Sequence, residues 1–266
     1  MEQPGRAVKQ PGRAVKQPGR AVKQPEPAVK QPLAARLKPW LELVWFLAAG
    51  YGLFVVGSLA VGLLFEQVGL ALSLALYAVN VVCFVGAAYW LGARRAGGWA
   101  AFGLRAFDLR WVAPALLAAL LLLPVRGLAA LIANALLGGG DASLQPRLDL
   151  MLPPGPLGLN LALTLLGAGL LVPLAEELYF RGLLHGWLAE RLSLWPRVLL
   201  SSALFALGHF DNAGVMAASF ILGLLCALAL ERSRSLWLPI IIHAVNNSVA
   251  LLVVYGAVAL TNRLGS

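Results

Sequence analysis

Long apolar segments separated by short polar ones fill the chain from Trp40 almost to its C-terminus. Several of them exceed the roughly 18 apolar residues that mark a membrane-spanning helix. The pattern predicts an all-α, polytopic membrane helix bundle with about seven to eight transmembrane helices. The expected spans cover 40–65, 69–92, 111–137, 157–191, 197–210, 214–231 and 236–260.

A single charge in the third segment leaves the number of spans open. Arg126 lies in the middle of this apolar stretch, two residues after Pro124. A charged side chain is costly in hydrocarbon. Either the segment is broken into two spans, or Arg126 faces a polar interior.

The composition agrees with a membrane protein. Of the 266 residues, 60% are hydrophobic and 12% are charged, whereas a soluble domain has about 25% charged residues. The two cysteines, Cys83 and Cys226, both lie in apolar stretches. They predict neither a metal-binding pattern nor a disulfide framework.

Residues 1–39 differ from the rest of the chain. The heptad QPGRAVK begins at Gln3 and is repeated at Gln10 and Gln17, and a degenerate copy, QPEPAVK, begins at Gln24. A proline in every repeat forbids a continuous helix, and the heptads have no apolar pair that a coiled coil would bury. We therefore expect a disordered basic tail.

The tail also carries most of the net charge of +9. It holds nine of the 21 Lys and Arg residues but only two Glu. A basic segment beside the first span is typical of a cytoplasmic flank that is attracted to anionic lipids. Nucleic-acid binding is not expected.

The loops between the spans alternate in charge, which predicts the orientation. The loops expected on one side carry Arg94, Arg95, Arg105, Arg110, Arg191, Arg197, Arg232 and Arg234. The loops on the other side carry Glu66, Asp141, Asp149 and Asp211, with Arg147 as the one basic residue. Basic loops stay inside, so we expect a multi-pass protein of the plasma membrane with a cytoplasmic N-terminus. An odd number of spans would place the C-terminus outside.

Ionisable residues inside spans suggest function, and the fourth span has a group of them. Glu177 and Arg181 are four residues apart, in the favourable order for an ion pair on a helix. Glu176 points about 100° away from Glu177, so it can face a cavity. A carboxylate in apolar surroundings suits a general base, although a purely structural Glu–Arg pair remains the alternative.

Two further polar groups are expected at the same depth. Phe205 and His209 share one helical face, as do His243 and Asn247. Glu176 and His209 lie about 17 and 15 residues from the turn that joins their spans, or roughly 22–25 Å. Asn247 lies roughly 20 Å beyond the next turn on the same side. We therefore expect these side chains in one layer of the bundle.

Three motifs resemble those of the CAAX-protease-like family, also named CPBP or Abi. Residues 176–181 resemble E-E-x-x-x-R, residues 205–209 resemble F-x-x-x-H, and residues 243–247 resemble H-x-x-x-N/D. They follow one another in family order. The resemblance implies a transmembrane protease domain over 40–262, with its motif core at about 110–255.

The resemblance implies an intramembrane endopeptidase that hydrolyses peptide bonds of membrane-associated peptides or proteins. Glu176 and His209 would activate a water molecule, and His243 and Asn247 would stabilise the oxyanion. Glu177 and Arg181 would orient the motif helix. Asn246 is a further polar residue beside this group.

The family is often described as metalloproteases, which raises the question of zinc. The chain has no H-E-x-x-H helix. Glu176, His209 and His243 would be the three ligands if zinc were bound. We favour a water activated by glutamate, because Asn247 suits an oxyanion site better than a metal site.

The chain has one further histidine, and two other functions are compatible with its intramembrane residues. His185 is nine residues from Glu176, about half a turn away on the helix, and we interpret it as structural. A proton-coupled transporter would also use intramembrane ionisable residues. A non-catalytic scaffold or bacteriocin-immunity protein on the same fold is the other alternative.

Overall fold

The computed structural model describes residues 33–137 and 141–264, which form helices and contain no strand within these ranges. The predicted tail lies largely outside the described residues. Six helical segments are long and apolar enough to cross a membrane. They cover Lys38–Gly62, Leu70–Ala96, Leu109–Leu137, Leu157–Ala189, Ala213–Ser233 and Trp237–Asn262. The predicted all-α polytopic bundle is confirmed.

The remaining predicted span is shorter than the others. It is α11 (Leu194–Leu207), an apolar helix of 14 residues. At about 1.5 Å per residue it is ~21 Å long, below the roughly 30 Å of a hydrocarbon core. The predicted count of seven to eight full spans is therefore not confirmed for the described residues.

Several spans are built from shorter helices that continue through π-helical turns. The first span contains α1 (Leu33–Leu47) and α2 (Leu53–Gly62), the second contains α3 (Leu70–Ala88) and α4 (Arg94–Ala96), and the fourth contains α8 (Leu157–Thr164), α9 (Val172–Glu177) and α10 (Gly186–Ala189). The other helices are α5 (Trp99–Phe102), α6 (Val112–Leu137), α7 (Asp141–Met151), α12 (Ala213–Ser233) and α13 (Trp237–Leu264).

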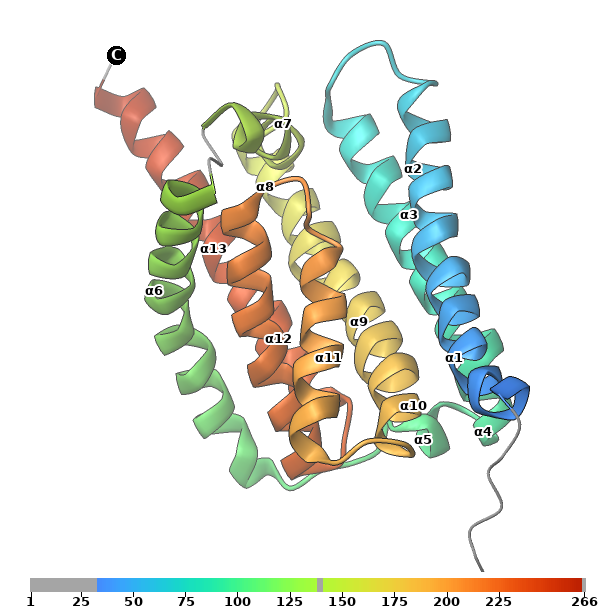
Figure 1. The fold of residues 1–266 in the computed structure, drawn as a ribbon. Helices are drawn as coiled ribbons and strands as arrows, with labels where there is room; N and C mark the ends of the chain where they lie inside the picture. The colour runs from blue at the N-terminus through green and yellow to red at the C-terminus, as the bar shows by residue number, and fades with distance from the viewer. Residues whose placement is uncertain (1–32, 138–140, 265–266) are drawn as a thin grey trace, which may run out of the picture.

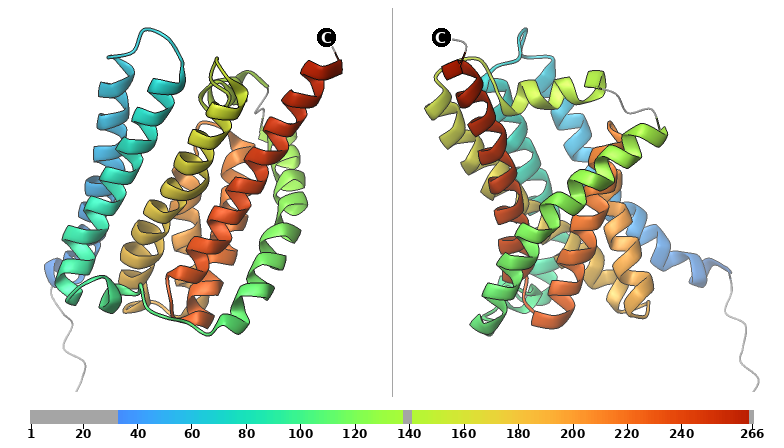
Figure 2. Two further views of the ribbon diagram at one scale, coloured as in Figure 1. Left: turned by 180° about the vertical axis from the view of Figure 1, so that it is seen from behind. Right: turned by 90° about the vertical axis from the view of Figure 1, so that its left-hand side faces the viewer.

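The helices run side by side, and the two ends of the bundle differ. The start of α1, the short helices α4 and α5, and α10 lie at one end, which we name the basic end because its connections carry the arginines (Figure 1). The loop after α2, helix α7 and the C-terminal end of α13 lie at the opposite end, as Figure 2 also shows. The two ends of the described chain thus lie at opposite ends of the bundle.

An aromatic core joins the first two spans to the fourth and to α11. The ring of Phe84 stacks on Tyr179 with centroids 4.8 Å apart, and Phe180 packs edge-on against Phe205 at 5.1 Å. A side chain at Gly50 would lie 2.3 Å from the Tyr179 ring, so a small residue is required for this close approach. Elsewhere, large apolar side chains such as Leu63 and Leu131 point outward, as lipid-facing residues do.

The third span settles the alternatives for Arg126. Helix α6 continues unbroken through Pro124 to Leu137. The Nε atom of Arg126 donates to the carbonyl oxygen of Ala218 on α12 at 3.0 Å. The side chain also lines an internal cavity, so Arg126 faces a polar interior and the segment is not broken in two.

Candidate active site

A cavity of about 610 Å³ lies between the spans, and its wall contains the residues that the motifs single out. Glu176, His209, His243 and Asn247 all line it. They come from three separate stretches of sequence, so only the packing of the spans brings them together. The four side chains that were expected to meet thus line one cavity.

The two adjacent glutamates have different surroundings, as the helical geometry predicted. Glu177 Oε2 lies 3.1 Å from Arg181 Nε, and both side chains are fully buried. Arg181 also donates from Nη2 to the carbonyl oxygen of Gly223 at 3.0 Å. Glu176 instead lines the cavity. The Glu177–Arg181 pair and the separate orientation of Glu176 are thus present in the structure.

His243 lies between the two glutamates, which the sequence did not predict. Its Nδ1 atom is 2.8 Å from Glu177 Oε1, and its Nε2 atom is 3.7 Å from Glu176 Oε2. Glu177 therefore binds a cation with one oxygen and the imidazole with the other. Because an ionised carboxylate only accepts hydrogen bonds, Nδ1 of His243 carries a proton and donates it.

His209 follows the C-terminal end of α11, and its hydrogen bond determines its tautomer. Nδ1 lies 3.2 Å from the carbonyl oxygen of Phe205. A carbonyl oxygen only accepts, so Nδ1 is the protonated nitrogen. In the neutral ring, Nε2 then has a free lone pair, and the side chain lines the cavity.

The motif phenylalanine packs against both histidines. The centroid of the Phe205 ring is 5.3 Å from His209 and 5.4 Å from His243, and Arg181 Cζ lies 4.7 Å from the same ring. One buried aromatic ring thus contacts both histidines and the arginine that supports Glu177. This packing explains why an aromatic residue precedes His209 by one helical turn.

Two neighbouring asparagines of α13 have different positions. Asn247 lines the cavity, and its Nδ2 atom makes only a long bond, 3.4 Å, to the carbonyl oxygen of Ala168. Asn246 is fully buried and donates to the carbonyl oxygen of Ala119 on α6 at 2.9 Å. Asn247 is therefore available to a ligand, whereas Asn246 joins two helices.

Sequence reasoning missed Asn80. Its Nδ2 atom donates to Glu176 Oε1 at 3.3 Å, and the residue is buried in α3. The signal was present, since Asn80 is a strongly polar residue in the middle of an apolar span. It was overlooked because it belongs to no motif.

An ion pair lies at the wall of the cavity near α7. Arg147 binds Asp211 through two hydrogen bonds of 2.5 Å. Burial raises the pKa of Asp211, but the hydrogen bonds and charge of Arg147 outweigh it and lower the pKa below its usual value. The carboxylate therefore stays ionised and holds α7 against the loop that carries His209.

The residues do not fit the zinc site that was considered. Among the described residues, no three His, Cys, Asp or Glu side chains are grouped as metal ligands. Glu176 and His243 are close, but His209 is not grouped with them. The mechanism below therefore uses the side chains alone.

His185 does not line this cavity, as predicted. Its Nδ1 atom is 2.9 Å from Ser201 Oγ, and its Nε2 atom is 2.8 Å from Glu231 Oε1. Arg197 binds both oxygens of Glu231, at 2.6 and 2.7 Å. This group connects the fourth span to α11 and α12 near the basic end.

Comparisons with known proteins agree with the motifs. A family model described as type II CAAX prenyl endopeptidase Rce1-like matches residues 158–249, and all three motifs fall inside this range. An "uncharacterized 24.3 kDa protein" of Escherichia coli is 34% identical over 97 residues. The match covers 35% of this chain and 45% of that protein, so the chain spans less than half of the relative's length. The comparison with solved structures gave no match.

The match is shorter than the predicted motif core of about 110–255, but it contains every residue that the motifs contribute to the cavity. It lies within a bundle of apolar helices that suits a multi-pass membrane protein. Residues 158–249 therefore match the Rce1-like CAAX endopeptidase family, which is the kind of membrane protease that the three motifs resemble.

Proposed function

We propose that this protein is an intramembrane endopeptidase that hydrolyses peptide bonds of membrane-associated peptides or proteins. One observation carries the proposal: Glu176, His209, His243 and Asn247 line one cavity although they come from three separate stretches of the chain. Complete motifs on a family-matched segment support the same activity.

Glu176 is the proposed general base. A water molecule in the cavity would lose a proton to Glu176 as its oxygen attacks the scissile carbonyl carbon. The lone pair on Nε2 of His209 would accept the second hydrogen bond of that water and orient it. Glu176 would then give the proton to the leaving nitrogen as the C–N bond breaks, so protons balance over the cycle.

His243 and Asn247 are the proposed donors to the oxyanion. Asn247 would exchange its long bond to Ala168 for one to the developing negative oxygen. His243 would donate from Nε2 when its ring carries both protons, with Nδ1 held by Glu177. One such preorganised donor contributes about 2.7–4 kcal/mol to transition-state stabilisation. Arg126, in the same wall, adds positive charge to the cavity.

Three residues would support these groups without touching the substrate. Glu177 positions the His243 ring, and Arg181 neutralises Glu177. Asn80 holds one oxygen of Glu176, which leaves the other for the water. A fixed orientation of the base and the donors reduces the reorganisation that the reaction requires.

The setting of the enzyme follows from the charges. The arginine-rich loops support a plasma-membrane protein with a cytoplasmic N-terminus and a tail near anionic lipids. The substrate would be a membrane-embedded peptide or protein, because the cavity lies between apolar spans.

The test is cleavage of quenched-fluorescent peptides that carry a hydrophobic tail, by full-length protein in detergent. Glu176→Gln and His209→Ala should each lower kcat/KM by about 10²–10⁴-fold. Glu190→Gln is the matched control, because Glu190 directly follows the same span, is exposed and pairs with its neighbour Arg191. Each variant is also assayed with a chelator and with added zinc.

The outcomes separate the candidate functions. Selective loss in the two site variants supports the protease. Equal activity of wild type and Glu176→Gln on a broad peptide library would rule out the proposal and leave a scaffold, an immunity protein or a transporter. If a chelator abolished peptide cleavage and added zinc restored it, a metal mechanism would replace the glutamate mechanism.

A further inference from the structure

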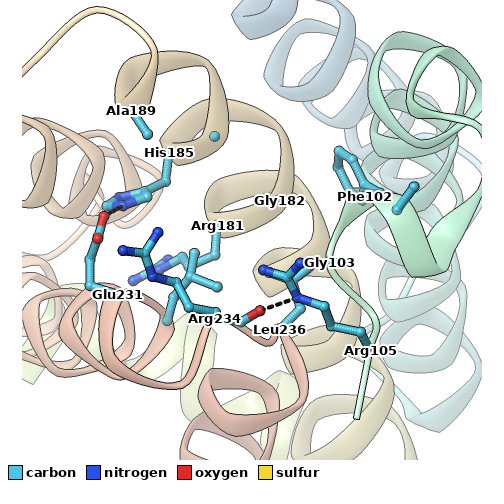
Figure 3. Close-up of a pocket in the computed structure, with 13 residues that line it drawn as sticks. Phe102, Gly103, Arg105, Arg181, Gly182, His185, Ala189, Glu231, Arg234 and Leu236 are labelled. Atoms are coloured by element: carbon cyan, nitrogen blue, oxygen red, sulfur yellow. Dashed lines mark hydrogen bonds and ion pairs between the residues drawn. The ribbon is translucent and has the colours of Figure 1, made fainter. Parts of the chain in front are cut away.

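A second, smaller pocket of about 180 Å³ lies at the basic end, where the loop after α5, the fourth span and the turn between α12 and α13 meet. Three arginines line it: Arg105, Arg181 and Arg234. In Figure 3 their guanidinium groups lie between His185 and Glu231 on one side and Gly103 on the other. Like charges repel one another, so such a group is stabilised by an anion.

The pocket does not supply that anion itself. Glu231 is the carboxylate in its lining, and Arg197 already binds both of its oxygens. Among the described residues, no carboxylate lies within ion-pair distance of Arg105 or Arg234. Two positive charges therefore remain uncompensated around the pocket.

Arg181 provides an independent sign of a missing partner. Its side chain is fully buried, and its Nη1 atom has no hydrogen-bond partner. A buried guanidinium N–H without an acceptor destabilises the folded protein. The other nitrogens contact Glu177 and Gly223, so Nη1 is the donor that remains for a ligand.

The backbone around the pocket is preorganised. Arg105 Nε donates to the carbonyl oxygen of Arg234 at 2.5 Å, and Leu236 N donates to the carbonyl oxygen of Gly103 at 2.9 Å. Arg234 has a left-handed conformation with φ of 56°, rare outside glycine and asparagine. These contacts connect the two loops and hold in place the backbone that carries the exposed side chains of Arg105 and Arg234.

From these observations we propose that the pocket binds the phosphate of an anionic lipid headgroup. Arginine forks match phosphate oxygens, and the volume equals about six water molecules at ~30 Å³ each, enough for a phosphate group. Basic pockets between spans at the cytoplasmic surface are suited to lipid headgroups. Free phosphate has the same chemistry, and the experiment distinguishes the two sources.

Binding here would also reach the catalytic cavity, a consequence that rests on the proposed function. Arg181 borders the pocket, and its guanidinium pairs with Glu177, which in turn holds His243. A phosphate that accepts a hydrogen bond from Nη1 would hold Arg181 in this position. The lipid is thus expected to increase turnover without contacting the substrate.

Binding is measured first, so that its failure is distinct from failure of the protease proposal. Full-length protein in an uncharged detergent is titrated with short-chain phosphatidylglycerol, with phosphatidylcholine, or with inorganic phosphate, while the thermal unfolding midpoint is recorded. A ligand that binds only the folded state raises this midpoint. Phosphatidylglycerol should raise it, and phosphatidylcholine should not.

The variants test the location of the site. Arg234→Asn should weaken phosphatidylglycerol binding by at least about tenfold, and asparagine tolerates the left-handed backbone. Arg232→Asn is the matched control, because Arg232 is an exposed neighbour that does not line the pocket. Arg105→Lys keeps the positive charge but loses the paired donors of the guanidinium group, so it should weaken binding less than Arg234→Asn does. It is the substitute test if Arg234→Asn fails to fold.

The possible results are distinct. Loss of phosphatidylglycerol binding in Arg234→Asn but not in Arg232→Asn supports the lipid site. An equal shift with inorganic phosphate supports the site but identifies free phosphate as the ligand. Equal binding by the two asparagine variants, or an equal response to phosphatidylcholine, would overturn the proposal.

Discussion

Two buried groups in this bundle each combine a histidine with a glutamate, but only one leaves its polar atoms unused. In the group near the basic end, both ring nitrogens of His185 have partners, Ser201 and Glu231. Arg197 binds both oxygens of that glutamate. The hydrogen bonds within this group are satisfied by protein atoms, which is typical of a structural network.

The group in the large cavity is different. Glu177 contacts Arg181 and His243, whereas Glu176, His209 and Asn247 line a space of about 610 Å³. Unused donors and acceptors in an apolar surrounding are costly, so they indicate a place that a polar ligand can occupy. The comparison shows that residue type alone does not distinguish the two groups, whereas hydrogen-bond satisfaction does.

The largest expected effect comes from removing the charge that compensates Arg181. Glu177→Gln leaves a fully buried guanidinium unpaired, which should lower the free energy of unfolding by about 3–5 kcal/mol. Thermal or denaturant unfolding in detergent measures it. The double variant Glu177→Gln with Arg181→Met removes both charges and should recover much of the loss. A Glu177→Gln protein as stable as Glu190→Gln would contradict this interpretation.

The next effect separates the neighbouring asparagines. Asn247→Ala should lower kcat by about 10²–10³-fold because an oxyanion donor is lost, with little change in stability, since its bond to Ala168 is long. Asn246→Ala should keep kcat but lower the free energy of unfolding by about 1 kcal/mol. Peptide cleavage and unfolding are measured on both variants. If Asn246→Ala lost activity and Asn247→Ala lost only stability, the oxyanion role proposed for Asn247 would be wrong.

The smallest effect concerns the satisfied group. Ser201→Ala leaves Nδ1 of His185 without its partner and should lower the free energy of unfolding by about 1–3 kcal/mol. Turnover per folded molecule should stay unchanged, because the group does not line the cavity. Ser202→Ala is the control, since its hydroxyl bonds within its own helix to Val198. A drop in kcat for Ser201→Ala alone would show that the two groups are coupled.

Much of the site could be predicted from local periodicity. The i,i+4 spacing of Glu177 and Arg181 predicted an ion pair that the structure contains, because a helix fixes such neighbours whatever surrounds it. The position of His243 between two glutamates could not be predicted, since it depends on how α13 packs against α9. Asn80 was missed for the same reason, because its partner lies 96 residues away.

By itself, the sequence determined the membrane class, the approximate spans, the resemblance to a protease family and the residues of the three motifs. These follow from composition, helical spacing and short motifs, which are local properties of a chain. The tertiary structure alone decided that α11 is a short helix, that Arg126 faces the cavity, and that three arginines from distant parts of the chain line one pocket. The physical reason is that the burial and pairing of a charge depend on neighbouring spans. The tilt and register of those spans are set by how they pack against one another, which the sequence of a single helix does not determine.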